Sequence, residues 1–297
     1  MTDKNDVEDK GQKFMKKAKI IVLSGQSNAV GVGHVKCLKR SFTDAKIEEY
    51  FNGYGNIKIN YYSHDKKSDG FTVTKRGCTE VQKDTIGPEM GMAEYLNSKF
   101  PGEEFFIVKF AVGGASLKRD FLSPSSGGYY NINEFKNEYN GFIDAFFAGE
   151  NVKVGWCYNG LVRVLYDSID YLKEMGYDPE IIGFCWMQGE SDSRNLEDVN
   201  YYKVYFDNFI NDFQKEFSEY LKDCVFADAG ISDVWNYYKE MNAFKREYAR
   251  KHNKFIYVDT IENGLTTKYE PVEEPDIAHY DCESVIKLGK LFVKNII

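Results

Sequence analysis

One serine, Ser27, has the surroundings that nucleophilic chemistry requires. It lies in Gly25-Gln26-Ser27-Asn28, directly after the apolar run Ile20 to Leu23. The run predicts a buried parallel strand, and the small polar residues predict a tight turn at its carboxyl end, where open α/β sheets bind ligands. A helix that begins at such a turn directs backbone N–H groups at an anion. Ser27 is therefore a candidate nucleophile, although the tetrapeptide alone is also typical of an ordinary turn.

A serine hydroxyl needs a neighbouring imidazole to become nucleophilic, and the chain has four histidines. His279 is the best candidate, because Asp276 precedes it by three residues and Pro275 favours an extended entry into a loop. On one turn, the Asp276 carboxylate can accept the Nδ1 proton of His279 and leave Nε2 for the serine. A helix cap or a solvated loop pair is the alternative for this spacing. His34 has no carboxylate at a fixed short spacing, and His64 and His252 lie in charged stretches.

Two further strand ends carry groups that can stabilise an oxyanion. The run Phe105 to Val112 is followed by Gly113 and Gly114, whose backbone can approach a ligand with unhindered N–H groups. The run Ile181 to Met187 is followed by Gln188, whose amide can donate toward the same crevice. Each feature alone is more often structural, but together they indicate acyl transfer. Motifs for phosphate, dinucleotide or zinc binding are missing, so we expect no metal and no cofactor.

The elements that must position these residues follow a β-α-β rhythm. Short apolar runs alternate with longer stretches that have apolar residues at helical spacing, which predicts an α/β fold with helices on both faces of a sheet. The predicted strands are Ile20–Leu23, Phe105–Val112, Ile181–Met187, Cys224–Ala229 and Phe255–Val258, with Ile57–Tyr62 as a further strand near an edge; the predicted helices are 88–100, 158–177, 199–221, 234–252 and 284–297. Long loops at 63–84 and 118–150 interrupt this rhythm and are expected to border the crevice.

Composition limits the partners and the organisation of the chain. The 297 residues include only six prolines and show no sharp compositional break, so we expect a polar N-terminal segment, 1–18, and one domain, 19–297. A net charge of −8 without a basic run argues against nucleic acid or an anionic membrane as partner. The six cysteines show no metal or disulfide pattern and favour a reducing, cytoplasmic compartment, with secretion as the alternative if a signal peptide has been removed. The oligomeric state is left open.

Five sequence blocks, taken in order, resemble those of the SGNH hydrolase superfamily. More narrowly, they resemble its sialate O-acetylesterase and acetylxylan esterase branch, carbohydrate esterase family six. The blocks are Gly25-Gln26-Ser27-Asn28, Gly87-Pro88-Glu89, Gly113-Gly114-Ala115-Ser116, Trp186-x-Gln188-Gly189-Glu190-Ser191-Asp192 and Asp276-x-x-His279. The resemblance spans residues 19–297 and implies a flavodoxin-like, three-layer α/β/α sandwich with about five parallel strands.

The resemblance also implies a role for each matching residue. Ser27 is the nucleophile, His279 the general base and Asp276 the residue that orients it. The oxyanion hole comprises the Ser27 and Gly114 N–H groups, with Gly113 as the second choice, and the Gln188 side chain, which stands where the wider superfamily has Asn. Candidate substrate contacts are Gln26, Asn28 and Glu190, although for Glu190 we favour a structural role, such as capping the next helix or supporting the loop. Two departures, Ala29 in place of a common Met and the long stretch Lys118 to Trp156, are expected to shape the acyl or alcohol pocket.

The predicted activity is hydrolysis of O-acetyl esters on a carbohydrate, such as sialic acid or xylan, through an acetyl-enzyme intermediate. One alternative is a lipase or thioesterase of the same fold that acts on longer acyl chains. Another is a catalytically idle carbohydrate-binding relative. The sequence does not indicate which acetylated sugar is the substrate.

Overall fold

A computed structural model describes residues 15–63, 66–77, 84–134, 153–268, 270, 273 and 275–297. His64 and much of the two predicted long loops, 63–84 and 118–150, lie outside these ranges. The predicted sites at Ser27, Gly114, Gln188 and His279 all lie within them.

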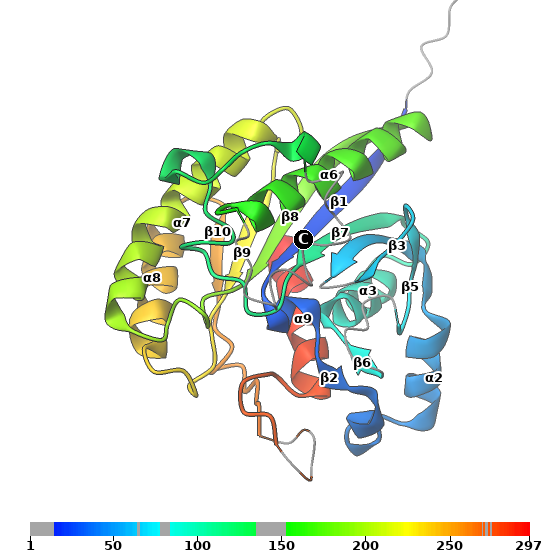
Figure 1. Cartoon of the computed structure of the whole chain (residues 1–297). Coiled ribbons are helices and arrows are strands. Elements are labelled where there is room, and N and C mark those ends of the chain that lie inside the picture. The colour runs from blue at the N-terminus through cyan, green and yellow to red at the C-terminus, as the bar shows by residue number, and fades with distance from the viewer. Residues whose placement is uncertain are drawn as a thin grey trace, which may run out of the picture.

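The described chain forms a mainly parallel sheet between layers of helices (Figure 1). Six of its strands run parallel, in the spatial order β3-β7-β1-β8-β9-β10. These strands are β1 (Lys16–Gly25), β3 (Tyr54–Ser63), β7 (Phe105–Ala111), β8 (Tyr177–Met187), β9 (Val225–Ala229) and β10 (Phe255–Val258). Five of these strands are the predicted ones, and the sixth, β3, is the further strand that the sequence predicts near an edge. β1 begins at Lys16, before the expected domain boundary at residue 19.

Short strands extend this framework. β4 (Lys66–Lys67) and β5 (Thr72–Thr74) pair antiparallel with β3, so β3 is covered at the sheet edge. β2 (Gly33–His34) and β6 (Thr85–Ile86) form a separate antiparallel pair. The sheet is therefore mixed at its β3 edge and parallel elsewhere in the described chain.

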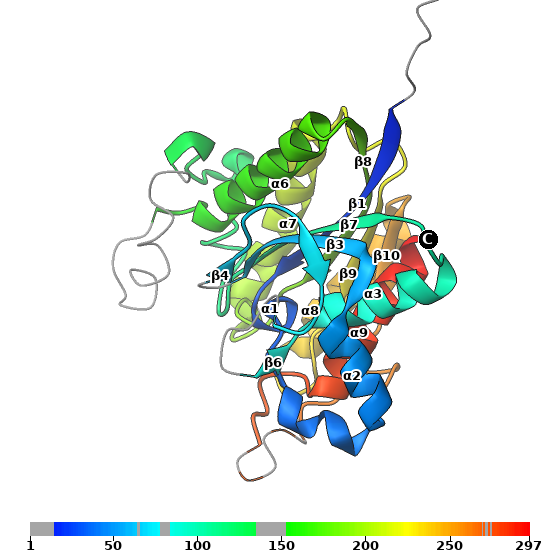
Figure 2. The same ribbon diagram turned by 90° about the vertical axis from the view of Figure 1, so that its right-hand side faces the viewer.

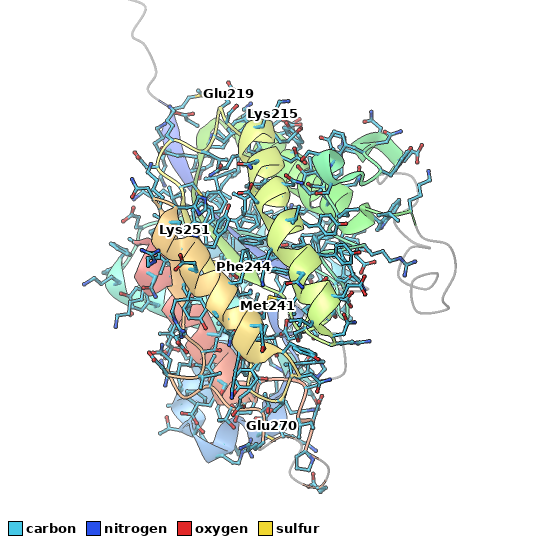
Figure 3. All side chains as sticks on the ribbon, turned by 90° about the vertical axis from the view of Figure 1, so that its left-hand side faces the viewer. Lys215, Glu219, Met241, Phe244, Lys251 and Glu270 are labelled. Carbon is cyan, nitrogen blue, oxygen red and sulfur yellow. The ribbon has the colours of Figure 1, made fainter. Side chains whose placement is uncertain are left out.

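The helices cover both faces of the sheet, as the apolar strands require. In Figures 1 and 2, α3 (Pro88–Lys99) and α9 (Cys282–Ile296) lie on one face, and α6 (Trp156–Glu174) and α7 (Leu196–Glu216) lie on the other. Figure 3 shows α8 (Tyr238–Lys251) beside α7. The shorter helices are α1 (Ser27–Val30), η1 (Val35–Arg40), α2 (Asp44–Asn52) and η2 (Pro124–Ser126). Because both faces are covered, strand residues such as Val22 and Leu23 are fully buried, which explains the continuous apolar runs.

Two glycines allow α3 and α9 to contact each other through their backbones. A side chain at Gly91 would overlap the Ile286 carbonyl, and one at Gly289 would overlap the Pro88 carbonyl. This close packing holds the start of α9, which follows directly after the segment that carries His279. The helix pair thus fixes the predicted base relative to the sheet.

The strand order places a topological switch point at β1. From β1 the chain builds β3 and β7 on one side of it, and then β8, β9 and β10 on the other side. In open α/β sheets, ligands bind in the crevice at the carboxyl ends of the strands beside such a point. The turn that carries Ser27 lies at that end of β1. Of the helices described, none has the length and apolar character that a bilayer crossing requires.

Candidate active site

The turn that carries Ser27 is held between the ends of β7 and β8. Gly25 has a φ of +140°, and a Cβ there would overlap the Met187 carbonyl, so only glycine fits this position. The Gln26 N–H donates to the Met187 carbonyl at 2.9 Å, and the Val112 N–H donates to the Gly25 carbonyl at 3.1 Å. Ser27 itself is half-buried at the start of α1. Neither its hydroxyl nor its N–H is hydrogen-bonded to a residue in the described ranges.

The predicted base and its acid partner are in direct contact. His279 Nδ1 lies 2.5 Å from Asp276 Oδ2, and Asp276 Oδ1 accepts the Ala278 N–H at 2.9 Å. The carboxylate therefore fixes both the turn and the imidazole, and no hydrogen bond joins Nε2 to the described chain. The side chains of His279 and Asp276 are 28% and 42% exposed, so the pair is open to solvent and substrate.

Asn28 joins the nucleophile turn to the segment that carries the base. Its Oδ1 accepts the Tyr280 N–H at 2.9 Å, and its Nδ2 donates to Glu190 Oε1 at 2.7 Å. Asn28 and Glu190 are fully buried, and burial raises the pKa of the Glu190 carboxyl while the Asn28 hydrogen bond opposes that rise. Ser27 comes directly before Asn28, and His279 comes directly before Tyr280. The Asn28–Tyr280 hydrogen bond therefore brings the two predicted residues to the same crevice.

The glycine turn after β7 is held by the loop after β8. Ser191 Oγ donates to the Gly114 carbonyl at 2.9 Å, and Asp192 accepts the N–H groups of Leu117 and Lys118 at 2.8 and 3.1 Å. Burial raises the pKa of the Asp192 carboxyl to about 6, against these hydrogen bonds. Gly114 is exposed at a φ of +73°, and its N–H has no acceptor among the described residues. That N–H is therefore available to a ligand.

The Gln188 side chain is arranged differently from its predicted role. It is fully buried, and its Nε2 lies 2.5 Å from Asp192 Oδ2, 3.2 Å from the Ala115 carbonyl and 3.3 Å from Gln26 Oε1. An amide has two N–H groups, and these three acceptors use both. The geometry therefore favours a positioning role for Gln188 over donation to an oxyanion.

The predicted substrate contacts, Gln26, Asn28 and Glu190, are also buried and bonded to the protein. Gln26 Oε1 accepts the Ser191 N–H at 3.1 Å as well as the Gln188 amide, and Asn28 and Glu190 bond to each other. Their exposed fractions are between 0 and 2%, which leaves them no surface for a substrate. In the described structure these three side chains hold parts of the protein together, and their role as substrate contacts stays a prediction.

A buried lysine that sequence reasoning misses supports the β8 end of the site. Lys245, on α8, is fully buried, and its Nζ donates to the Gln188 carbonyl at 2.6 Å, Asp228 Oδ1 at 2.6 Å and the Ala229 carbonyl at 2.9 Å. Burial raises the pKa of the Asp228 carboxyl to about 6, and Lys245 opposes the rise. Asp228 interrupts the apolar run Cys224 to Ala229, and a lone charge in such a run is the signal that predicts a buried partner.

A second buried lysine supports α1. Lys109 Nζ donates to the Val30 carbonyl, the last residue of α1, and to Glu89 Oε2, each at 2.7 Å. Lys109 is a lone charge within an apolar run, and Glu89 belongs to the Gly87-Pro88-Glu89 block. The ion pair thus links the lone charge of β7 to the Gly87-Pro88-Glu89 block. The hydrogen bond from Lys109 to Val30 holds the far end of the helix that begins at Ser27.

Glu270 anchors the loop that carries the base. Its carboxylate accepts the His34 N–H at 2.6 Å, the Cys282 N–H at 2.8 Å and Arg40 Nη2 at 2.8 Å, and its carbonyl accepts the Asp276 N–H at 2.7 Å. Glu270 is labelled at the lower end of the molecule in Figure 3. Glu270 therefore links the Asp276 backbone to both β2 and α9.

The other described histidines have structural contacts. The His34 N–H belongs to the Glu270 cluster, and the His252 ring stacks on Tyr248 with 3.9 Å between centroids. His64 lies outside the described residues. Of the histidines that the structure describes, His279 is the one whose ring is paired with a carboxylate.

Comparison with known proteins places this arrangement in a family context. Residues 17–297 match the sequence model of a family described as carbohydrate esterase, sialic acid-specific acetylesterase. A search of curated proteins found none that matches the chain.

Solved structures with low sequence identity share the fold. A protein from Arabidopsis thaliana is 18% identical, with 96% of this chain and 100% of that chain covered and a TM-score of 0.61. NanS is 16% identical over 95% and 97% of the two chains, with a TM-score of 0.63. A carbohydrate acetylesterase from Xanthomonas citri is 11% identical over 94% and 56%, with a TM-score of 0.57.

Proposed function

Because this chain belongs to the carbohydrate esterase family of sialic acid-specific acetylesterases, we propose that it hydrolyses O-acetyl esters on carbohydrate through Ser27, His279 and Asp276. The observation that carries the proposal is the Asn28–Tyr280 hydrogen bond, which joins the turn of the nucleophile to the segment of the base. The hydrogen bond between Asp276 and His279 Nδ1 supports the same roles, because it leaves Nε2 as the nitrogen that exchanges protons.

The reaction would proceed in two steps. His279 Nε2 takes the hydroxyl proton of Ser27 while Oγ forms a bond to the acetyl carbon, which gives a tetrahedral oxyanion. As the ester C–O bond breaks, His279 returns the proton to the sugar oxygen and an acetyl-Ser27 ester remains. Water then gives a proton to His279 and attacks this ester, and collapse releases acetate, with the proton passing back to Ser27 Oγ. Asp276 holds the imidazole and stabilises its charged form.

The oxyanion would rest on the N–H groups of Ser27 and Gly114. Both N–H groups lack an acceptor in the described chain, which is the state that a preorganised oxyanion hole requires. Gly113 is the second choice. Gln188 would position other residues, because its amide donates to Asp192 and Gln26. Asp192 accepts a backbone N–H after the glycine turn, and Gln26 accepts one in the loop after β8.

The family description makes O-acetylated sialic acid the first substrate to test. Acetate release is measured from O-acetylated sialic acid, acetylated xylo-oligosaccharides and p-nitrophenyl acetate. We expect the wild type to release acetate from at least one acetylated glycan and Ser27→Ala to release none.

Ser98→Ala is the matched control, because Ser98 is exposed on α3 and its hydroxyl bonds only the Tyr95 carbonyl within the described chain. It should keep wild-type activity. Acetate release by Ser27→Ala at the wild-type rate, or no release by the wild type from any of the substrates, would contradict the proposal.

A further inference from the structure

A cavity of about 450 Å³ lies between α6 and the β3 edge of the sheet. In Figure 2, α6 lies above the strand pair β3 and β4. The cavity is lined by residues of β3, of the segment after β4 and of α6, among them Asn60, Asp69, Gly70, Arg163, Asp167 and Tyr171. Its volume falls within the range of small-molecule sites. None of the roles assigned above uses it.

The strand register separates this cavity from Ser27. Asn60 pairs with Val108, and Val108 pairs with Val22, which lies three residues before the end of β1. Three residues of strand and two strand spacings each amount to about 10 Å, so the backbone of Asn60 lies roughly 14 Å from the end of β1. That distance exceeds one sugar ring and is within the length of a short oligosaccharide.

The polar groups of the cavity suit a neutral ligand with many hydroxyls. Arg163 binds the Asp167 carboxylate through Nε at 3.0 Å and through Nη2, which leaves Nη1 without a partner in the described chain. The Asp69 carboxylate also has none among the described residues. Lys67 and Arg163 balance Asp69 and Asp167, so the lining favours neither an anion nor a cation. A guanidinium that donates and a carboxylate that accepts match the hydroxyls of a sugar.

One wall of the cavity is an aromatic ring that the fold holds in place. Tyr171 is 40% exposed, and its ring contacts Phe71 with 5.8 Å between centroids. Gly70, at a φ of +75°, lies against the same ring, and an added Cβ would be 3.2 Å from Cε2. A tyrosine ring fixed by such packing offers a rigid, amphipathic surface to the C–H face of a sugar. Asn60, which also lines the cavity, is held by hydrogen bonds to Ser168 and Ser68.

We propose that this cavity binds a sugar residue of the glycan remote from the acetyl ester, so that the enzyme acts on oligosaccharides in preference to single sugars. The nature of the ligand rests on the proposed function; the presence of a carbohydrate site does not depend on Ser27. Tyr171 stacks on the sugar, while Asp69 and Arg163 Nη1 bind its hydroxyls.

The test compares an acetylated monosaccharide with an acetylated oligosaccharide whose remote sugars are neutral: xylose with a xylo-oligosaccharide, and sialic acid with sialyllactose. We expect Tyr171→Ala to lower kcat/KM on the oligosaccharide by about three- to tenfold, the range for one aromatic contact, and to leave the monosaccharide unchanged. Asp69→Ala should act in the same direction, and it removes no hydrogen bond that the described structure contains. Tyr201→Ala is the control, because Tyr201 is 44% exposed on α7 and should affect neither substrate.

A binding measurement separates this proposal from the proposed function. Calorimetric titration of Ser27→Ala with deacetylated xylohexaose and with sialyllactose, whose galactose and glucose are neutral, needs no catalysis. Suppose that the wild type releases no acetate but the oligosaccharide binds, and that Tyr171→Ala weakens this binding. That result would support the sugar site in the cavity and contradict the esterase assignment. Acetate release by the wild type with equal effects of Tyr171→Ala on both substrate lengths, or no binding of either oligosaccharide, would overturn the cavity proposal.

Discussion

Replacing Lys245 by methionine should lower the free energy of unfolding by about 3–5 kcal/mol at pH 8, the cost of breaking a buried ion pair from one side. Methionine keeps most of the side-chain volume but removes three hydrogen bonds, two of them to carbonyls at the ends of β8 and β9. It also leaves the Asp228 carboxylate, whose Oδ2 is already without a hydrogen-bond partner in the described structure, buried without a counter-charge. The loss is therefore much larger than that of a surface ion pair.

The pH dependence of this loss gives a sharper test. Burial already raises the pKa of Asp228 to about 6 in the presence of Lys245, and the folded-state pKa should rise further without it. A carboxyl whose folded pKa is above its unfolded value of about 3.9 lowers the stability as the pH rises from the unfolded pKa to the folded pKa, and the loss is complete above the folded pKa. At pH 5.5 the carboxyl is largely protonated, so the deficit of Lys245→Met should be smaller than at pH 8.

Urea denaturation at both pH values measures these differences. Lys254→Met is the control, because its ion pair with Asp223 is exposed and should contribute less than about 1 kcal/mol. Adding Asp228→Asn to Lys245→Met should restore part of the stability, since no unpaired charge is then buried. The reasoning would be refuted if the free energy of unfolding of Lys245→Met at pH 8 were within about 1 kcal/mol of the wild-type value. It would also be refuted if the loss of stability were the same at both pH values.

Three further predictions concern the site itself. Gln188→Ala should lower both kcat and the free energy of unfolding, the latter by about 1–3 kcal/mol in urea denaturation, because it leaves buried acceptors unpaired; a loss of kcat with unchanged stability would instead indicate an oxyanion donor. Gly25→Ala should cost more than about 4 kcal/mol or prevent folding, whereas Gly102→Ala, at a φ of +80° with open space around it, should cost about 1 kcal/mol in thermal or urea unfolding. Asp276→Asn should lower kcat about a hundredfold in an acetate-release assay, less than the 10⁴-fold of a buried triad carboxylate because Asp276 is 42% exposed; an unchanged kcat would count against its orienting role.

Much of the fold follows from local patterns in the sequence. Strands buried on both faces are continuous apolar runs, so β1, β7, β8 and β9 can be located from the sequence, and Gly25 and Ser27 mark the turn after β1. The run that forms β10 is also apolar, although only Val258 is buried in it. The three-residue spacing of Asp276 and His279 is likewise a local feature, and the observed hydrogen bond agrees with it. The helix α2 is missed because only Ile47 and Tyr50 are buried along it, which is too short a pattern to recognise.

Contacts between distant segments account for the rest. The residues Lys16 to Ala18 are polar or small, and they extend β1 because β8 offers partners to them. The role of Gln188 depends on which acceptors surround its amide, and two of the three, Gln26 and Ala115, come from distant segments. Lys245 lies between Met241 and Tyr248 on the buried face of α8, but its Nζ bonds to groups at the ends of β8 and β9, which lie far from it in the chain.

Covalent labelling tests the central claim most directly, because it reports on the Ser27 hydroxyl itself. The protein is treated with a fluorophosphonate, and the adduct is located by intact mass and peptide mapping. We predict a single adduct on Ser27, none on Ser27→Ala, and labelling slowed by at least about a hundredfold in His279→Ala, which lacks the base. A different labelled residue, or equal labelling rates in the wild type and His279→Ala, would contradict activation of Ser27 by His279.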